Sequence, residues 1–126
     1  MSLIAQQLDH QYFAHRLRKR YQVLREEIRN TLLRADAEQY AHIADRVQNT
    51  EDQSLAEVLA EVSHAEIARD VEEVCDITVA LQRIASGDYG VCTGCGDQIP
   101  QARFEAHPTA KRCLKCQQLY EQANAR

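Results

Sequence analysis

Four cysteines near the C-terminus have the residue type and spacing of metal ligands. Cys92 and Cys95 form one Cys-x-x-Cys pair, Cys113 and Cys116 form another, and 17 residues separate the pairs. Two residues between cysteines allow a tight turn to point both thiolates at one ion, and the intervening loop returns the second pair to that ion. This spacing is typical of a structural zinc site, so we expect one Zn²⁺ per chain. Four thiolates leave no position for a reactive water, so we do not expect zinc catalysis.

Other roles for the cysteines and for one histidine are open at this point. The four paired cysteines could instead form a redox pair or be unrelated reduced thiols. Cys75 follows an apolar position of a predicted helix, and we interpret it as a small packing residue. His107 lies in the loop between the two pairs, where four thiolates already make a complete ligand set.

Composition limits the classes of protein that the chain can belong to. It has 126 residues and a net charge of −4, and its first ten residues do not resemble a secretory leader. No apolar run approaches the roughly 20 residues that a membrane span needs. We therefore expect a soluble, cytoplasmic protein without membrane contact, and a monomer. The acidic total argues against tight sequence-independent binding to DNA, which draws mainly on Lys and Arg, and we expect no direct, specific DNA binding either.

The first 86 residues have the pattern of long helices. No proline occurs before Pro100 and no glycine before Gly87, so the usual signals of strands and tight turns are missing. Apolar residues recur at the three- and four-residue steps of a coiled coil in two stripes. The first stripe is Leu17, Tyr21, Leu24 and Ile28; the second is Leu55, Val58, Val62 and Ala65, continued after a shift by Ile67, Val71, Val74, Thr78 and Leu81.

A polar segment between the stripes predicts the turn of a helical hairpin. Residues 47–54 include Asn, Thr and Ser, which compete with the helical backbone for hydrogen bonds. Residues 11–34 contain seven basic and two acidic side chains, whereas residues 35–76 contain two basic and twelve acidic ones, so opposite charges would face each other across the hairpin.

These patterns predict a mainly α protein in three parts. Residues 1–15 would form a short N-terminal helix packed on a globular base. Residues 16–86 would form a long antiparallel coiled-coil hairpin with its tip near residues 48–54. Residues 87–126 would form the four-cysteine zinc finger and a C-terminal helix, with Gly87 ending the helix before it.

The cysteine segment resembles the DksA/TraR zinc-finger family. Besides the four cysteines, Ile99, Arg103 and Pro108 stand at the family's spacing, while Thr93 replaces the acidic residue or Ser that is more usual. The resemblance implies a bacterial transcription regulator that binds RNA polymerase directly. It also implies that the coiled coil enters the polymerase secondary channel and reaches towards the active centre, where it modulates promoter complexes.

The resemblance also implies roles for individual residues. Members of the DksA type carry an Asp-x-x-Asp-x-Ala motif at the tip, and the matching positions here are Asn49, Asp52 and Ser54. Only the second aspartate is kept, so the charge that the tip brings to the catalytic magnesium is reduced. Arg69 matches a functionally important family arginine, and Arg103 is kept near the family's site for the alarmone ppGpp. Both are candidate polymerase contacts.

The resemblance further predicts little dependence on ppGpp. Two lysines that family members use at this alarmone site are replaced here by Asp76 and Gln117. An anion and a neutral amide do not attract a phosphorylated ligand.

Two other classes of function are weighed against this one. Transcript-cleavage factors of the GreA type also carry a coiled coil with acidic tip residues, a role that Glu51 and Asp52 could fill, but they lack the four-cysteine module. A zinc-finger nucleic-acid binder or a redox-sensing thiol protein is the other alternative. Lys111, Arg112 and Lys115 give only a modest basic cluster for nucleic-acid binding.

Overall fold

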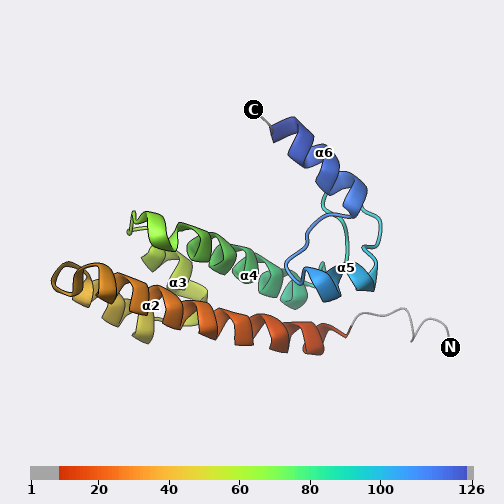
Figure 1. Ribbon diagram of the computed structural model, residues 1–126. Helices are drawn as coiled ribbons and strands as arrows, with labels where there is room; N and C mark the ends of the chain where they lie inside the picture. Colours follow the sequence, from red (N-terminus) through yellow and green to blue (C-terminus); the bar gives the residue numbers. More distant parts are fainter. Residues whose placement is uncertain (1–8, 125–126) are drawn as a thin grey trace. The chain divides into compact units, whose positions relative to one another are not determined.

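The computed structural model describes residues 9–124 and is mainly helical, as the sequence predicts. Two compact units are present: the arm, residues 18–79, and the base, which combines residues 9–17 with residues 80–124. The only pairing of β type within the described residues is an isolated bridge between Val91 and Gln98. The helices are α2 (His10–Asn49), α3 (Asp52–Leu59), the 3₁₀ turn η1 (Ala65–Ile67), α4 (Ala68–Ser86), α5 (Gln101–Ala106) and α6 (Leu114–Asn124) (Figure 1).

Helix α2 is interrupted at Asp36, where the arm reverses direction. The backbone of Asp36 is non-helical, with φ −164° and ψ 93°, and its Oδ1 accepts a hydrogen bond of 3.0 Å from the backbone N–H of Gln39. This is the geometry of an N-cap, so a new helix begins after Asp36. Arg25 and Val47 are equally distant from Asp36 in sequence, and the Arg25 guanidinium donates to the Val47 carbonyl at 2.7 Å. The two halves of α2 therefore pair antiparallel.

Two further turns bring the chain back along the first half of α2. After Thr50 and Glu51 the chain enters α3, and a salt bridge of 2.9 Å joins Arg46 to Glu61 just beyond that helix. His64 then caps η1, because its Nδ1 accepts from the backbone N–H of Glu66 at 3.2 Å. Helix α4 lies beside the first half of α2, where Arg20 and Glu73 form an ion pair of 2.7 Å.

The apolar stripes supply the core of the arm. Leu24 and Ile28 are fully buried, and so are Leu55 and Val74 from the second stripe. Val62 and Ala65 do not join them, because they lie in the turn between α3 and α4. In α4 the pattern holds only in part: Val71, Thr78 and Leu81 of the predicted stripe are half-buried, whereas Ile77 and Ala80, outside the stripe, are buried.

The position of the tip is a correction to the expected hairpin. Residues 48–54 do not form its far end in this structure, because Asp52 contacts Tyr21 and Arg25 in the first half of α2. The arm instead reverses at Asp36 and at residues 60–67. The physical reason is that the Asp36 cap ends the first helix early, so the following segment folds back on it.

In the base, an aromatic cluster packs the start of α2 against the cysteine-bearing segment. The Phe13 ring lies 6.1 Å from the Phe104 ring, and Tyr89 lies 4.6 Å from Phe104, measured between centroids. Residues 10–15 are the first turns of α2 and not a separate helix. Residues 1–8 of the expected N-terminal helix lie outside the described residues.

Gly87 ends α4 as expected and directs the chain into the base. Its φ is +86°, and the N–H groups of Gly87 and Asp88 donate to the carbonyls of Ile84 and Arg83. These two hydrogen bonds define a Schellman C-cap, which favours glycine at the residue with positive φ. Across residues 9–124, no helix combines the length and apolar character that a bilayer span requires.

Candidate metal centre

A short reversal of the backbone presents the first cysteine pair. The Cys92 N–H donates to the Asp97 carbonyl at 2.8 Å, and the Ile99 N–H donates to the Gly90 carbonyl at 2.8 Å. Within this turn, a Cβ atom at Gly94 would lie 2.9 Å from the Cys116 Sγ. Only glycine therefore allows the second pair to approach so closely.

Two hydrogen bonds to backbone carbonyls, one from a backbone N–H and one from a side chain, hold the second pair beside the first. The Thr93 N–H donates to the Lys111 carbonyl at 2.8 Å, and the Arg103 Nε donates to the Arg112 carbonyl at 2.8 Å. Cys113 follows directly, and Cys116 lies in the first turn of α6. The segment before the second pair is thus fixed from both sides.

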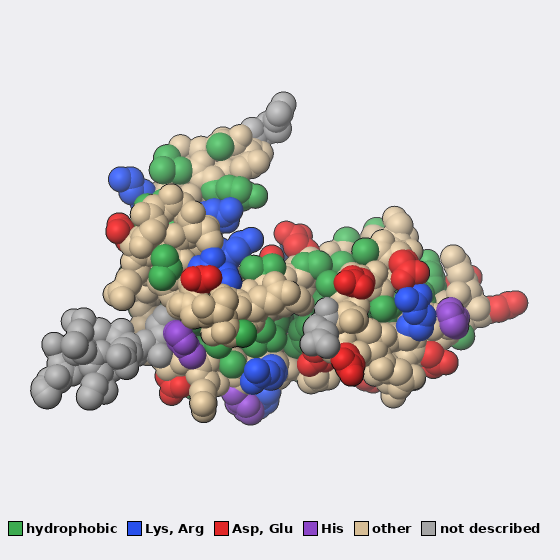
Figure 2. Space-filling view, turned by 180° about the vertical axis from the view of Figure 1, so that it is seen from behind, with side chains coloured by type: hydrophobic (Ala, Val, Ile, Leu, Met, Phe, Trp, Pro, Cys, Tyr) green, Lys and Arg blue, Asp and Glu red, His purple; other side chains and the backbone are tan. Residues whose placement is uncertain are grey.

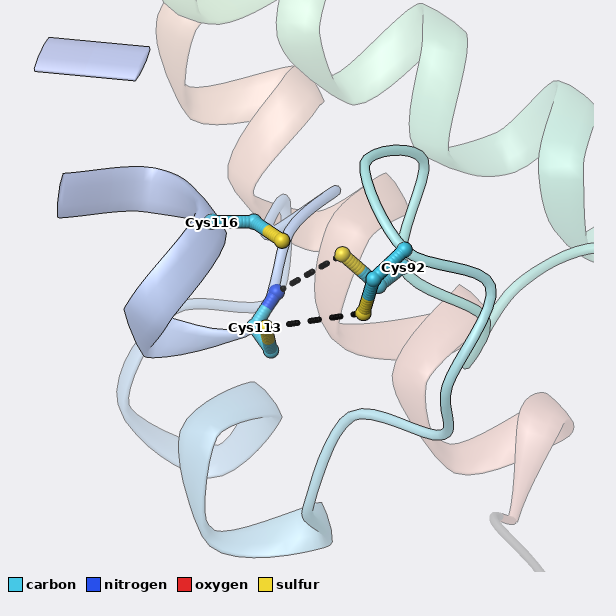
Figure 3. A group of neighbouring side chains, drawn as sticks. Cys92, Cys113 and Cys116 are labelled. Carbon is cyan, nitrogen blue, oxygen red and sulfur yellow. Dashed lines mark hydrogen bonds between the residues drawn. The ribbon is translucent and has the colours of Figure 1, made fainter. Parts of the chain in front are cut away.

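All four thiols converge on one point. The Sγ atoms of Cys92, Cys95, Cys113 and Cys116 lie within 4.8 Å of one another, and those of Cys95 and Cys113 are 4.0 Å apart. Figure 3 shows Cys92, Cys113 and Cys116 of this group. Four sulfurs at about 2.3 Å from a central zinc would be roughly 3.8 Å apart, which is close to this arrangement. The predicted ligand set is therefore assembled, and it is the only such cluster found among residues 9–124.

Electrostatics show why this cluster needs a cation. Burial raises the pKa of Cys92. Hydrogen bonds from backbone N–H groups, first that of Cys113 and then those of Cys95 and Gly94, lower it by a larger amount, so the pKa is about 6. The neighbouring thiols, Cys113 first and then Cys92, raise the pKa of Cys116 to about 12. Adjacent thiolates repel one another, so all four ionise together only with a positive ion among them.

The donor set fits a soft divalent metal in a structural role. Four sulfurs complete a tetrahedral coordination sphere, which leaves no position for water or substrate. The two backbone N–H groups that donate to the Cys92 Sγ, from Gly94 and Cys113, are both at 3.3 Å and orient one ligand. The centre therefore links the two ends of the segment from Cys92 to Cys116, and its complete coordination sphere does not suit hydrolysis.

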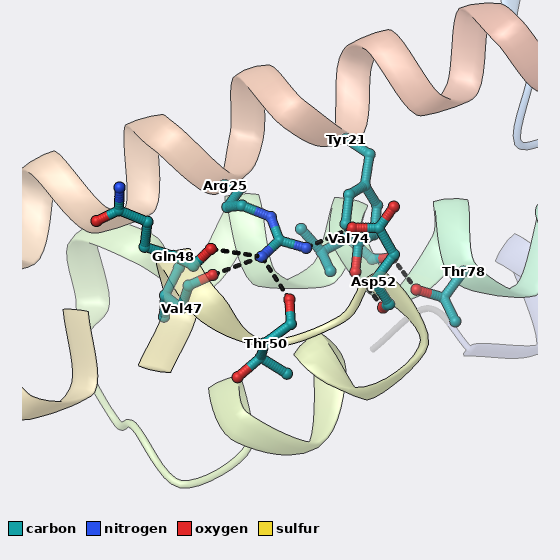
Figure 4. Close-up of polar contacts among 8 residues, drawn as sticks. All are labelled: Tyr21, Arg25, Val47, Gln48, Thr50, Asp52, Val74 and Thr78. Atoms are coloured by element: carbon teal, nitrogen blue, oxygen red, sulfur yellow. Dashed lines mark hydrogen bonds and ion pairs between the residues drawn. The ribbon is translucent and has the colours of Figure 1, made fainter. Parts of the chain in front are cut away.

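The predicted tip residues lie together but in an unexpected environment. Asn49 is exposed at the end of α2, and Ser54 is half-buried in α3. The Asp52 carboxylate pairs with the Arg25 guanidinium, and the Tyr21 hydroxyl donates to the Asp52 backbone carbonyl (Figure 4). Burial, and then the Asp52 charge, raise the pKa of Tyr21 to about 12.

The two predicted arginines have different surroundings. Arg103 is half-buried and supports the backbone before Cys113, so the structure gives it a structural contact. Arg69 is exposed near the start of α4, and no ion pair involving it occurs in the described part of the chain.

Sequence reasoning missed two residues that shape the arm, Arg25 and Asp36, and it placed Tyr21 in the apolar stripe without its hydrogen bond to the Asp52 carbonyl. Asp36 had a readable signal, because Asp-x-x-Gln at residues 36–39 is close to a capping box. Arg25 had none, since a single arginine on a basic helix normally lies in solvent. Besides the Asp52 carboxylate, its partners are the backbone carbonyls of Val47 and Thr50, which no side-chain pattern reveals.

Comparison with known proteins gives the family. Residues 87–122 match the model of the prokaryotic dksA/traR C4-type zinc finger. The RNA polymerase-binding transcription factor DksA of Caulobacter vibrioides is 31% identical over 113 residues, which cover 88% of this chain and 75% of that protein. An uncharacterized protein of Aquifex aeolicus is 40% identical over 60 residues, covering 48% of this chain and 39% of that one.

A solved structure supports the fold over nearly the whole chain. Transcription factor DksA2 from Pseudomonas aeruginosa matches with a TM-score of 0.59 and 23% identity, covering 99% of this chain and 98% of that one. The match includes the helical arm as well as the cysteine segment. Because the arm, the four-cysteine centre and the full-length similarity agree, the chain belongs to the DksA/TraR C4-type zinc-finger family.

Proposed function

We propose that this protein is a transcription regulator that binds RNA polymerase and modulates promoter complexes. The observation that carries this proposal is similarity to a polymerase-binding DksA over 88% of the chain, which includes both the arm and the base. The arm would enter the secondary channel of the polymerase, and the base would remain outside. The protein would act as a monomer in the cytoplasm, by binding and without catalysing a reaction.

The metal of the base is proposed to be zinc, one ion per chain. Cys92, Cys95, Cys113 and Cys116 would hold it, because four thiolates in a tetrahedral arrangement favour Zn²⁺. Its role would be to fix the loop between the two pairs, which buries only Ile99 and Phe104 as large apolar side chains.

Residues 49, 52 and 54 are proposed as the segment that faces the polymerase active centre. Asp52 supplies the acidic group, while Asn49 and Ser54 are neutral. Arg69 is proposed as a polymerase contact because its side chain is exposed and has no ion pair of its own among the described residues. For Arg103 a polymerase contact would have to coexist with its hydrogen bond to the Arg112 carbonyl.

Surface charge supports a protein partner in preference to DNA. Asp and Glu side chains are spread along the arm on the face shown in Figure 2, and residues 35–76 carry twelve acidic residues against two basic ones. Such a surface repels the phosphates of DNA. A GreA-like cleavage activity is not favoured, because the relatives are DksA-type regulators.

Site-specific photocrosslinking tests the proposed route of entry. A photoreactive residue at the exposed position 49 should crosslink to core RNA polymerase near its active centre, and competition by a known secondary-channel protein should remove the crosslink. The same residue at position 118, exposed on α6, serves as the control and should not give that product. Failure of the full-length protein to co-purify with core polymerase would contradict the proposal.

A further inference from the structure

The two interruptions of the arm lie opposite each other in a common helical register. Asp36 and His64 are each 14 residues from Thr50, and both are N-caps with extended backbone. Near the base, Arg20 pairs with Glu73, and the Tyr21 side chain interacts with that of Thr78. In an antiparallel hairpin, the turn lies midway in sequence between two residues that face each other. The sequence midpoints of these two pairs fall at about residues 46–50. The α2–α4 pairing is therefore the pairing of a hairpin that turns near residue 50.

The distal half of the arm follows nearly the same register. Arg46 pairs with Glu61, and the Tyr40 ring lies 5.7 Å from the His64 ring, so the midpoints fall at about residues 52–54. One long antiparallel hairpin with its turn near residues 47–54 accounts for the contacts of both halves. The observed arm is that hairpin bent double at the level of Asp36 and His64.

We propose that the arm is a hinged hairpin. Asp36 and His64 form the hinge, and Arg25 is the latch that holds the distal half, residues 37–63, against the proximal half. Release of the latch gives a straight two-helix hairpin with residues 48–52 at its end.

The contacts of Arg25 have the properties that a latch requires. Arg25 is a buried residue, 9% exposed. Its guanidinium donates to the carbonyls of Val47 and Thr50 at 2.7 Å each and pairs with the Asp52 carboxylate (Figure 4). A cation at these carbonyls also interacts favourably with the C-terminal end of the α2 dipole. All of these partners belong to the distal half, so straightening the arm would break every one of them.

The latch is also incompletely satisfied. The Arg25 Nε is buried and has no hydrogen-bond partner within the described residues. A partly satisfied buried charge stabilises a conformation less than a complete network does. Straightening the arm therefore costs less free energy than it would if every Arg25 donor were hydrogen-bonded in the bent form.

The hinge exchanges one set of backbone hydrogen bonds for another. In the bent form the Asp36 carboxylate accepts from the Gln39 N–H, and the His64 ring accepts from the Glu66 N–H. In a straight helix these N–H groups would bond to carbonyls one turn earlier. Since the number of hydrogen bonds is similar, the latch and the apolar contacts between the halves decide which form dominates. We expect the bent form to dominate in the free protein.

A distance measurement in the free, full-length protein tests the hinge. Spin labels on noncanonical residues at the exposed positions 22 and 48 avoid the cysteines and report on the two halves. They are close in the bent form, because Arg25 contacts Val47, and roughly 39 Å apart along the axis of a straight hairpin, from 26 residues at 1.5 Å each. Double electron–electron resonance should show mainly the short distance in the wild type.

Two variants should shift the distribution to the long distance by different means. Arg25→Gln removes the latch and should lower the ratio of short to long distances at least about tenfold, as expected for lost charged hydrogen bonds. Asp36→Ala removes the hinge cap and favours a continuous helix, so it should shift the ratio in the same direction. Arg20→Gln is the matched control: it breaks an α2–α4 ion pair that both forms share and should leave the ratio unchanged.

Several results would overturn the hinge. The first is a wild type that shows only the long distance. The second is that Arg25→Gln and Asp36→Ala remain helical and keep the short distance. The third is that Arg20→Gln shifts the ratio of short to long distances as much as those two variants do. Loss of the helical circular dichroism signal in Asp36→Ala would also contradict it, because the straight arm would then not be a stable structure.

A second measurement, with core RNA polymerase added, connects the hinge to function and rests on the proposed function. Binding should convert the wild-type distribution to the long distance, because only the straight form presents residues 48–52 at its end. If the protein does not bind polymerase, the proposed function fails while the distances in the free protein still decide the hinge. If it binds and keeps the short distance, presentation of the tip by straightening is wrong.

Discussion

At the scale of single residues, the metal centre depends on the backbone around the cysteines as much as on the thiols. The Cys92 Sγ accepts from the N–H groups of Gly94 and Cys113, and these contacts contribute to its pKa of about 6. A ligand that is already inclined to ionise binds a metal with less competition from protons. The backbone around Cys92 therefore favours the thiolate form that a metal requires.

We expect Gly94→Ala to weaken metal binding about tenfold or more. The new methyl group would lie 2.9 Å from the Cys116 Sγ, so a ligand would have to move. Metal release to a chromogenic chelator measures the effect, and Thr93→Ala at the neighbouring exposed position is the control. Release rates that match the control would show that the turn absorbs the methyl group.

We expect Tyr21→Phe to change how stability depends on alkaline pH. The folded state raises the pKa of Tyr21 from 10.0 to about 12, chiefly through burial, so it holds the phenolic proton more tightly than the unfolded chain does. This contribution is complete below pH 10 and is lost as the pH rises towards 12. The variant lacks the hydrogen bond to the Asp52 carbonyl and should be about 1 kcal/mol less stable at pH 8.

Urea denaturation at pH 8 and pH 11 measures this difference. At pH 11 the wild type should have lost about 1 kcal/mol through Tyr21, so the two proteins should become nearly equal in stability. A gap that stays constant over this pH range would mean that the Tyr21 pKa is not raised.

At the scale of elements, the sequence predicts the helices better than it predicts their turns. The spacing of Leu17, Tyr21, Leu24 and Ile28 indicates a buried helical face, and all four side chains are buried. The end of a helix depends on smaller energies: an N-cap such as Asp36 contributes only about 1 kcal/mol. The hydrogen bond from Arg25 to the Val47 carbonyl, which accompanies the Asp36 cap, cannot be predicted from the pattern of residues. The ligand cysteines needed no such contact, because their spacing alone defines the site.

We expect Gly87→Ala to destabilise the protein by about 1 kcal/mol. Gly87 has a φ of +86°, a conformation that a residue with a Cβ adopts only at a cost. Chemical denaturation of the metal-loaded protein measures the loss, with Gln82→Ala, an exposed substitution within α4, as the control. Unchanged stability would mean that the C-cap tolerates a side chain.

At the scale of the whole molecule, the two units have separate sources of stability. The arm has its own apolar core, which includes Leu24, Ile28 and Leu55. The base combines the Phe13, Tyr89 and Phe104 cluster with the four-cysteine centre. Stability of the base should therefore depend on metal in a way that stability of the arm does not.

We expect chelation to loosen the base first. Hydrogen exchange should speed up for amides in residues 90–116, because the thiolates that join the ends of this segment would lose their common ion. Amides in residues 21–32 should keep their protection, since their helix packs within the arm. Equal loss of protection in both segments would contradict separate stabilisation, and no loss in either would argue against a structural metal.

We expect regulation by this protein to depend little on ppGpp. The resemblance to the family predicts that Asp76 and Gln117 stand where other members have alarmone-binding lysines, and the Gln117 side chain donates to Glu121 at 2.8 Å. The test is a ppGpp titration in transcription reactions with a polymerase that lacks its own alarmone site. The variant Asp76→Lys with Gln117→Lys should gain a response, and a strong response of the wild type would overturn the charge argument.

The reversal at Asp36 also changes the cross-section of the arm. A helix with its side chains is about 10–12 Å wide, so a straight hairpin is one helix thick and two helices wide. The bent arm places the two halves of α2 alongside α3 and α4, which makes it about twice as thick (Figure 1). A channel whose width matches two helices would admit the straight form and exclude the bent one. The width of the arm would then control its entry into the channel, before any side chain at the tip contacts the partner protein.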